Sequence, residues 1–69
     1  MNLPKGYIEL NGTTLLIAAD AVMFDFGIEE HGMPKSIWIP KSQLEDWPDK
    51  GENGEVLITE WIAGVKGLI

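Results

Sequence analysis

The sequence predicts an α+β domain dominated by strands: a small curved antiparallel sheet, or an open barrel, of about five strands with a short C-terminal helix. Short runs in which apolar and polar residues alternate indicate strands that are buried on one face. Glycine, proline and asparagine residues separate these runs and indicate turns. The last run follows a threonine and ends before a glycine, which are residues that commonly begin and end a helix.

The chain has 69 residues, enough for a single domain over residues 1–69. Hydrophobic residues make up 45% of the chain, which is too many for a disordered protein. The sequence contains no cysteine, so disulfide bonds and thiolate zinc sites are excluded. A domain this small is expected to be marginally stable, and an unusually full core or self-association would have to support it.

The first half of the chain contains three candidate strands. Residues 7–10 and 13–17 flank Asn11-Gly12, a residue pair that tolerates the positive φ angles of a two-residue hairpin turn. This pattern predicts a hairpin centred on Asn11-Gly12. Residues 21–26 alternate and are expected to form a third strand. The apolar residues on one face of that strand are Val22, Phe24 and Phe26.

A loop and a fourth strand are expected next. Residues 27–34 include two glycines and a proline, which indicates a mobile surface loop. Residues 37–39 are apolar and predict a strand that ends at Pro40 or lies at a sheet edge, because proline has no N–H to donate. Ser42 and Glu45 then have the spacing of a capping box, which predicts one helical turn.

A fifth strand and the C-terminal helix complete the expected fold. Residues 56–58 are apolar and predict the strand. Thr59 is expected to cap a helix over residues 60–66, and Gly67 is expected to adopt a left-handed conformation after it. The side chains expected on one side of this helix are Trp61, Ile62 and Val65.

Two tryptophan-bearing segments carry a resemblance to a known group of proteins. They are Trp38-Ile39-Pro40-Lys41-Ser42-Gln43 and, after an acidic loop, Thr59-Glu60-Trp61-Ile62-Ala63 with Lys66-Gly67-Leu68. This pattern resembles a short module in small proteins of phages and mobile elements and at the ends of some larger ones. The motifs are structural, and the hydrophobic first half of the chain lies outside them. The resemblance implies a phage or prophage accessory protein without implying a specific activity.

The sequence offers little for catalysis. His31 beside Glu29 and Glu30 combines residue types that bind divalent metals, but a lone histidine among glycines is more often solvated. Lys41 and Ser42 are neighbours, so their side chains point apart and do not form a nucleophile with its base. We therefore expect no catalytic residue, no metal site and no cofactor.

An acidic stretch is the strongest candidate for a binding surface. The chain has a formal charge of −6, and six of its acids lie within residues 45–60, where Lys50 is the one lysine. Spaced carboxylates of this kind can pair with arginines of a basic host or phage protein, as nucleic acid does. We expect Trp47 to anchor such an interface. The residues of the predicted surface are Glu45, Asp46, Trp47, Asp49 and Glu52.

Two alternatives remain open. The chain could bind single-stranded nucleic acid by stacking bases on Trp38 or Phe24 while Lys35 and Lys41 contact phosphates. The net negative charge and the absence of arginine count against this. The chain could instead be a structural module that associates with itself through exposed tryptophans or an unpaired sheet edge.

The sequence also bears on location. It has no apolar run of the roughly 18 residues that a transmembrane helix needs. Residues 1–6 lack the basic and then apolar pattern of a secretory signal. A cytoplasmic protein that does not contact the membrane is therefore expected.

Overall fold

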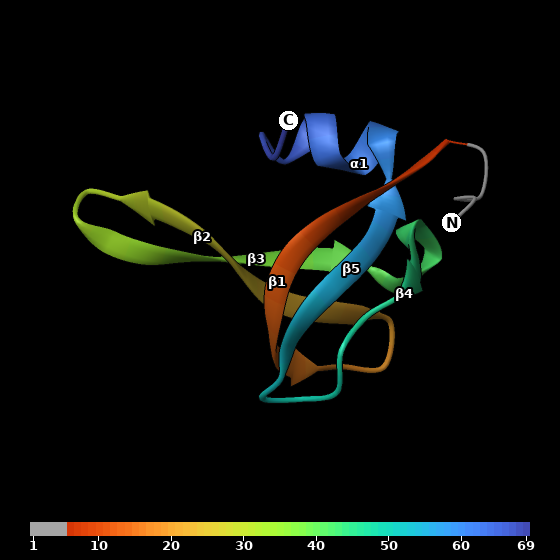
Figure 1. Cartoon of the computed structure of the whole chain (residues 1–69), viewed down its shortest axis with the longest axis horizontal. Helices are drawn as coiled ribbons and strands as arrows, with labels where there is room; N and C mark the ends of the chain where they lie inside the picture. The colour runs from red at the N-terminus through yellow and green to blue at the C-terminus, as the bar shows by residue number, and fades with distance from the viewer. Residues whose placement is uncertain (1–5) are drawn as a thin grey trace.

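A computed structural model describes residues 6–69 and confirms the β-dominated α+β class (Figure 1). Five strands form one antiparallel sheet in the order β3-β2-β1-β5-β4. The sheet is curved but open, because β3 and β4 are edge strands that do not pair with each other. The expectation about residues 1–6 lies almost entirely outside the described residues. The elements are β1 (Tyr7–Ile17), β2 (Ala21–Glu30), β3 (Met33–Pro40), η1 (Lys41–Gln43), β4 (Leu44–Asp46), β5 (Asn53–Thr59) and α1 (Glu60–Val65).

The hairpin predicted at Asn11-Gly12 is wrong, because both residues lie inside the continuous strand β1. The N-terminal half of β1 pairs with β5, where Leu10 lies opposite Val56. The C-terminal half pairs with β2, and a bulge interrupts this pairing between Thr14 and Leu16. The N-terminal half of β1 thus pairs with a strand far away in the sequence, whereas the C-terminal half pairs with the next strand along the chain, and the chain does not turn at Asn11-Gly12.

Gly12 has no side chain, and this leaves room for close packing against β1. A Cβ atom at this position would lie 2.8 Å from Cδ1 of Phe26 and 3.3 Å from Cγ2 of Val56. Phe26 of β2 can therefore lie directly on the backbone of β1. A glycine inside a strand commonly marks such a close approach.

The loop predicted over residues 27–34 is also wrong. β2 continues to Glu30, and β3 begins at Met33 after a two-residue turn. The turn residues His31 and Gly32 have φ angles of 55° and 76°, and paired positive φ angles are typical of tight hairpin turns. The resulting arm projects from the body of the molecule (Figure 1).

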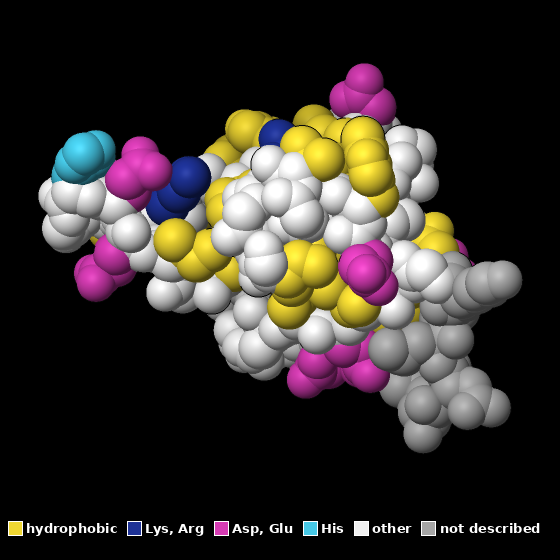
Figure 2. Space-filling view, turned by 90° about the horizontal axis from the view of Figure 1, so that it is seen from above, with side chains coloured by type: hydrophobic (Ala, Val, Ile, Leu, Met, Phe, Trp, Pro, Cys, Tyr) yellow, Lys and Arg dark blue, Asp and Glu magenta, His cyan; other side chains and the backbone are white. Residues whose placement is uncertain are grey.

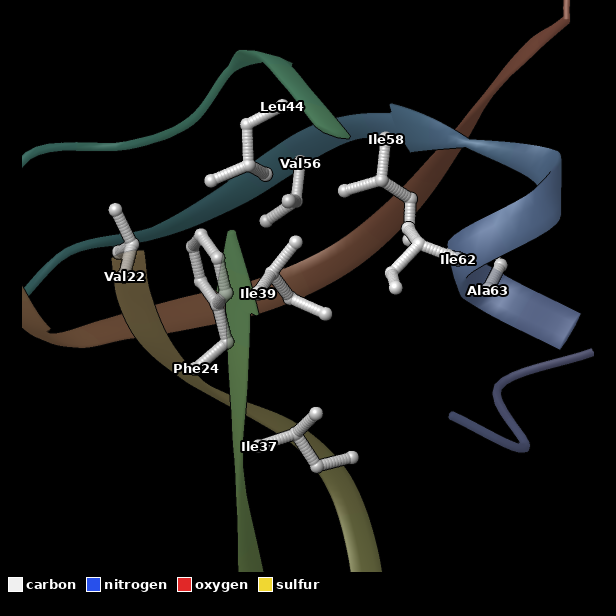
Figure 3. Packing of buried hydrophobic residues seen from close by; sticks show 9 residues of the cluster. All are labelled: Val22, Phe24, Ile37, Ile39, Leu44, Val56, Ile58, Ile62 and Ala63. Atoms are coloured by element: carbon white, nitrogen blue, oxygen red, sulfur yellow. The ribbon is translucent and has the colours of Figure 1, made fainter. Parts of the chain in front are cut away.

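The core lies on the concave face of the sheet and under α1 (Figure 3). Its buried side chains are Val22, Phe24, Ile37, Ile39, Leu44, Val56, Ile58, Ile62 and Ala63. The predicted inward face of residues 21–26 is confirmed, since Val22 and Phe24 are buried and Phe26 packs against the core. The rings of Phe24 and Phe26 have centroids 5.3 Å apart. The buried residues thus come from β2, β3, β4, β5 and α1, and the partly buried Ile8 and Leu10 of β1 pack against them.

The single turn predicted near Ser42 is present as the 3₁₀ helix η1, but the capping box is not. Pro40 precedes η1, and no side chain caps it. Ser42 lies inside the turn. Leu44 is the first residue of β4, and its side chain is buried in the core. The predicted role of Pro40 is confirmed, since β3 ends there at the edge of the sheet.

The caps of α1 are confirmed. The hydroxyl of Thr59 accepts a hydrogen bond of 3.2 Å from the amide of Ile62 and donates one of 2.6 Å to Gln43. At the other end, Gly67 has a φ of 72°, and the amide of Leu68 donates to the carbonyl of Ala63. The geometry at this C-terminal end is a Schellman motif, in which backbone hydrogen bonds satisfy the last carbonyls of a helix.

The predicted inner side of α1 is partly wrong. Ile62 is buried as expected, but its buried neighbour is Ala63. Trp61 and Val65 are exposed, because the turn from β5 directs Ile62 and Ala63 toward the core.

The close packing at Gly12 makes this residue a test of the fold. We expect Gly12→Ala to lower the free energy of unfolding by about 1–3 kcal/mol, because the new methyl group would overlap the ring of Phe26. Denaturant titration would measure this loss.

The double variant Gly12→Ala with Phe26→Leu provides the control. If the overlap is the cause, the double variant loses less stability than the two single variants together. Strictly additive losses would contradict the role assigned to Gly12.

Candidate functional site

Exposed carboxylates gather along one edge of the sheet. Glu45 and Asp46 lie on the edge strand β4, Asp49 and Glu52 lie in the following loop, and Glu55 lies on β5. We call these five residues the acidic edge. Among the described residues, one lysine and one carboxylate lie within 4.0 Å of each other, namely Lys35 and Glu30 at 3.2 Å. No carboxylate of the acidic edge therefore forms an ion pair with a lysine of the described residues. The acidic edge thus presents negative charge to solvent, and in this part of the chain only the exposed Lys50 of the same loop offsets it.

The loop that carries Asp49 and Glu52 is held firmly against β1. The hydroxyl of the buried residue Thr14 donates a hydrogen bond of 2.8 Å to the carbonyl of Pro48. The backbone of Thr14 also donates to the carbonyl of Glu52 and accepts from the amide of Gly51. These contacts restrict the conformations of the loop and so fix the positions of Asp49 and Glu52.

Trp47 does not serve as the exposed anchor that the sequence suggested. Its side chain is half-buried and packs against the hydrophobic core. Two contacts account for this, because the buried Leu44 and the hydrogen bond from the distant Thr14 to Pro48 draw the chain around Trp47 onto the sheet. The acidic edge thus brings together four of the five predicted residues without an exposed aromatic residue.

The residues of the alternative nucleic-acid site do not form one platform. Lys35 and Trp38 lie three positions apart on β3 and line one hollow together with Val65 and Lys66. Lys35 pairs with Glu30 on the projecting arm, and Lys41 lies in η1. Trp38 is exposed by 42% and lies opposite Met23 on β2. Lys35 thus lies beside Trp38, but Lys41 does not line the same hollow, so the two lysines do not flank Trp38 together.

The structure shows an apolar surface that the sequence analysis missed. Trp61 and Val65 of α1 are exposed by 66% and 60%, and Ile69 by 65%. Together with Glu60 and Gly64 they line a shallow hollow, and we call these five residues the α1 face. Figure 2 looks onto this side of the molecule and shows apolar side chains gathered on it. The recurrence of apolar residues at positions 61, 65 and 69 was the signal in the sequence.

Two further features concern the described part of the chain. Across residues 6–69, no three histidine, aspartate or glutamate side chains are placed to hold a metal ion together. Over the same residues, no helix is long and apolar enough to cross a membrane.

Comparison of the chain with protein-family models, with curated proteins and with solved structures finds no match in any of the three.

The anchoring role of Thr14 can be tested by an isosteric substitution. We expect Thr14→Val to lower the free energy of unfolding by about 1–3 kcal/mol, because the carbonyl of Pro48 loses its donor. Thr14→Ser is the matched control, since it keeps the hydroxyl and removes a methyl group. Chemical denaturation of both variants would measure the difference, and a serine variant as unstable as the valine variant would refute the role of the hydrogen bond.

Proposed function

We propose that this chain is a non-enzymatic protein-binding module whose contact surface is the acidic edge and whose partner is a basic protein. One observation carries the proposal: exposed carboxylates without lysine partners lie on an edge strand and on a loop that Thr14 holds in place. The proposal retains Glu45, Asp46, Asp49 and Glu52 as binding residues and assigns Trp47 to the core.

The physical basis of this binding is charge complementarity. The net charge of −6 and the concentration of acids on one edge would accelerate encounter with a basic surface. Arginines of the partner could then form charge-assisted hydrogen bonds with the free carboxylates. A row of carboxylates on a strand and loop also resembles the phosphates of nucleic acid in charge, so a nucleic-acid-binding protein is a suitable partner.

The biological setting is part of the proposal. The resemblance of the Trp38–Gln43 and Thr59–Ala63 segments to phage and mobile-element modules supports an accessory or inhibitor protein that acts in the cytoplasm. Binding of single-stranded nucleic acid has less support, because Lys35 is already paired with Glu30 and Lys41 does not line the hollow that Lys35 and Trp38 share.

The proposal can be tested by capture from a bacterial lysate. We expect the immobilised chain to retain a basic protein that resists nuclease treatment and is released by salt, because salt screens charged contacts. Retention of oligonucleotide that nuclease removes would favour the nucleic-acid alternative and overturn the proposal.

Charge reversal would locate the surface. We expect Glu45→Lys combined with Asp49→Lys to weaken the affinity for the isolated partner at least about tenfold, which corresponds to about 1.4 kcal/mol. Asp46 is left unchanged because its carboxylate accepts a hydrogen bond from the amide of Trp47. Isothermal titration calorimetry would measure the affinity.

The matched control is Glu29→Lys combined with Glu30→Lys. This pair makes the same change in net charge on the arm and breaks one exposed ion pair, which contributes little to stability. Equal weakening by both double variants would show that net charge, and not the acidic edge, controls binding.

A further inference from the structure

We infer that two copies of this chain associate through their α1 faces, with the two helices antiparallel. The inference begins from Trp61, whose side chain is exposed by 66%. The same helix buries Ile62 and Ala63 in the core, so Trp61 lies on its other side. Large apolar side chains gathered on one surface commonly mark an interaction site. Val65 and Ile69 lie beside Trp61 around the same hollow.

The α1 face contains both a projection and a recess. Trp61 projects from the helix, and Gly64 lies at the hollow one turn further along. A Cβ atom placed on Gly64 would meet no other atom within 4 Å, so the recess is open. In a twofold dimer, a contact from one residue of the first copy to another residue of the second copy is repeated with the copies exchanged. Trp61 of each copy can therefore fill the recess at Gly64 of the other.

The charges at the ends of the helix set the direction. Glu60 lies at the N-terminal end of α1 and Lys66 at the C-terminal end, and both are exposed. In an antiparallel pair, Glu60 of one copy lies at the same end of the interface as Lys66 of the other. A parallel pair would instead bring like charges together, which is unfavourable.

The exposed area is sufficient for a weak dimer. An aromatic side chain buries about 150–250 Å², so the exposed part of Trp61 offers on the order of 130 Å². Val65 and Ile69 extend this surface, and Trp38 joins it through a second hollow that Val65 and Lys66 also line. We place the apolar area at roughly 400 Å² per copy, near the lower limit for specific interfaces once the polar rim is added. An interface of this size is typical of a weak, reversible association.

Dimer formation would also add to the stability of so small a domain at high concentration. A chain of 69 residues has a small core, and this one has no cysteine for disulfide bonds. Covering the α1 face would bury further apolar surface. The acidic edge remains free in such a dimer, because in Figure 1 α1 lies at the top of the molecule and the loop between β4 and β5 lies at the bottom.

Sedimentation equilibrium from micromolar to millimolar concentration tests the inference. We expect the unaltered chain to pass from monomer to dimer over this range. A chain that stays monomeric at millimolar concentration would overturn the inference. This holds even if the α1 face is covered by another protein.

Two variants locate the interface. We expect Trp61→Ala to raise the dissociation constant at least tenfold, because it removes the projection. We expect Gly64→Gln to do the same by filling the recess, while its melting temperature at low concentration stays the same or rises, since glutamine favours helix more than glycine does. This second variant separates loss of the dimer from loss of the fold.

Met33→Ala is the matched control. Met33 is exposed by 66%, as Trp61 is, but lies next to the turn of the arm. We expect this variant to dimerise like the unaltered chain. If the dimer persists in both the Trp61 and the Gly64 variants, the copies associate through another surface and the inference fails.

Discussion

The pairing of β1 with two different strands is the constraint on which the rest of the structure depends. Its N-terminal half pairs with β5 and its C-terminal half with β2, so β1 joins the two parts of the sheet. Gly12 lies where these pairings meet, and its lack of a Cβ lets Phe26 cross the strand. Beyond this point β2 leaves β1, and Leu68 borders the opening with Leu10 and Ile28. The arm, the core and the position of α1 all follow from this divergence.

The open sheet separates two surfaces of different chemistry. The short edge strand β4 and its loop present carboxylates, whereas α1 covers one end of the core and exposes apolar side chains. The longer edge strand β3 contains Pro34, Lys35 and Pro40, and prolines and lysines discourage pairing with another sheet edge. The chain is therefore better suited to contacts through side chains of β4 and α1 than to addition of a strand.

Short-range patterns in the sequence predicted some elements well and others poorly. The cap at Thr59 and the glycine at position 67 were recognised, because capping depends on residues only a few positions apart. Asn11-Gly12 was mistaken for a turn because the same pair that favours a hairpin also permits Phe26 to approach the strand. Residues 27–34 were mistaken for a loop because a hairpin that extends beyond the core needs little apolar alternation.

The sequence by itself determined the β-rich class, the caps of the last helix and the position of the acids, since these depend on composition and neighbouring residues. Only the tertiary structure decided which tryptophans are available to a partner. Trp47 is drawn onto the core while Trp61 faces solvent, although each directly follows an acidic residue in the sequence. The physical reason is that burial depends on contacts between distant segments, here between Thr14 and Pro48 and between α1 and the sheet. Local residue patterns do not contain these contacts.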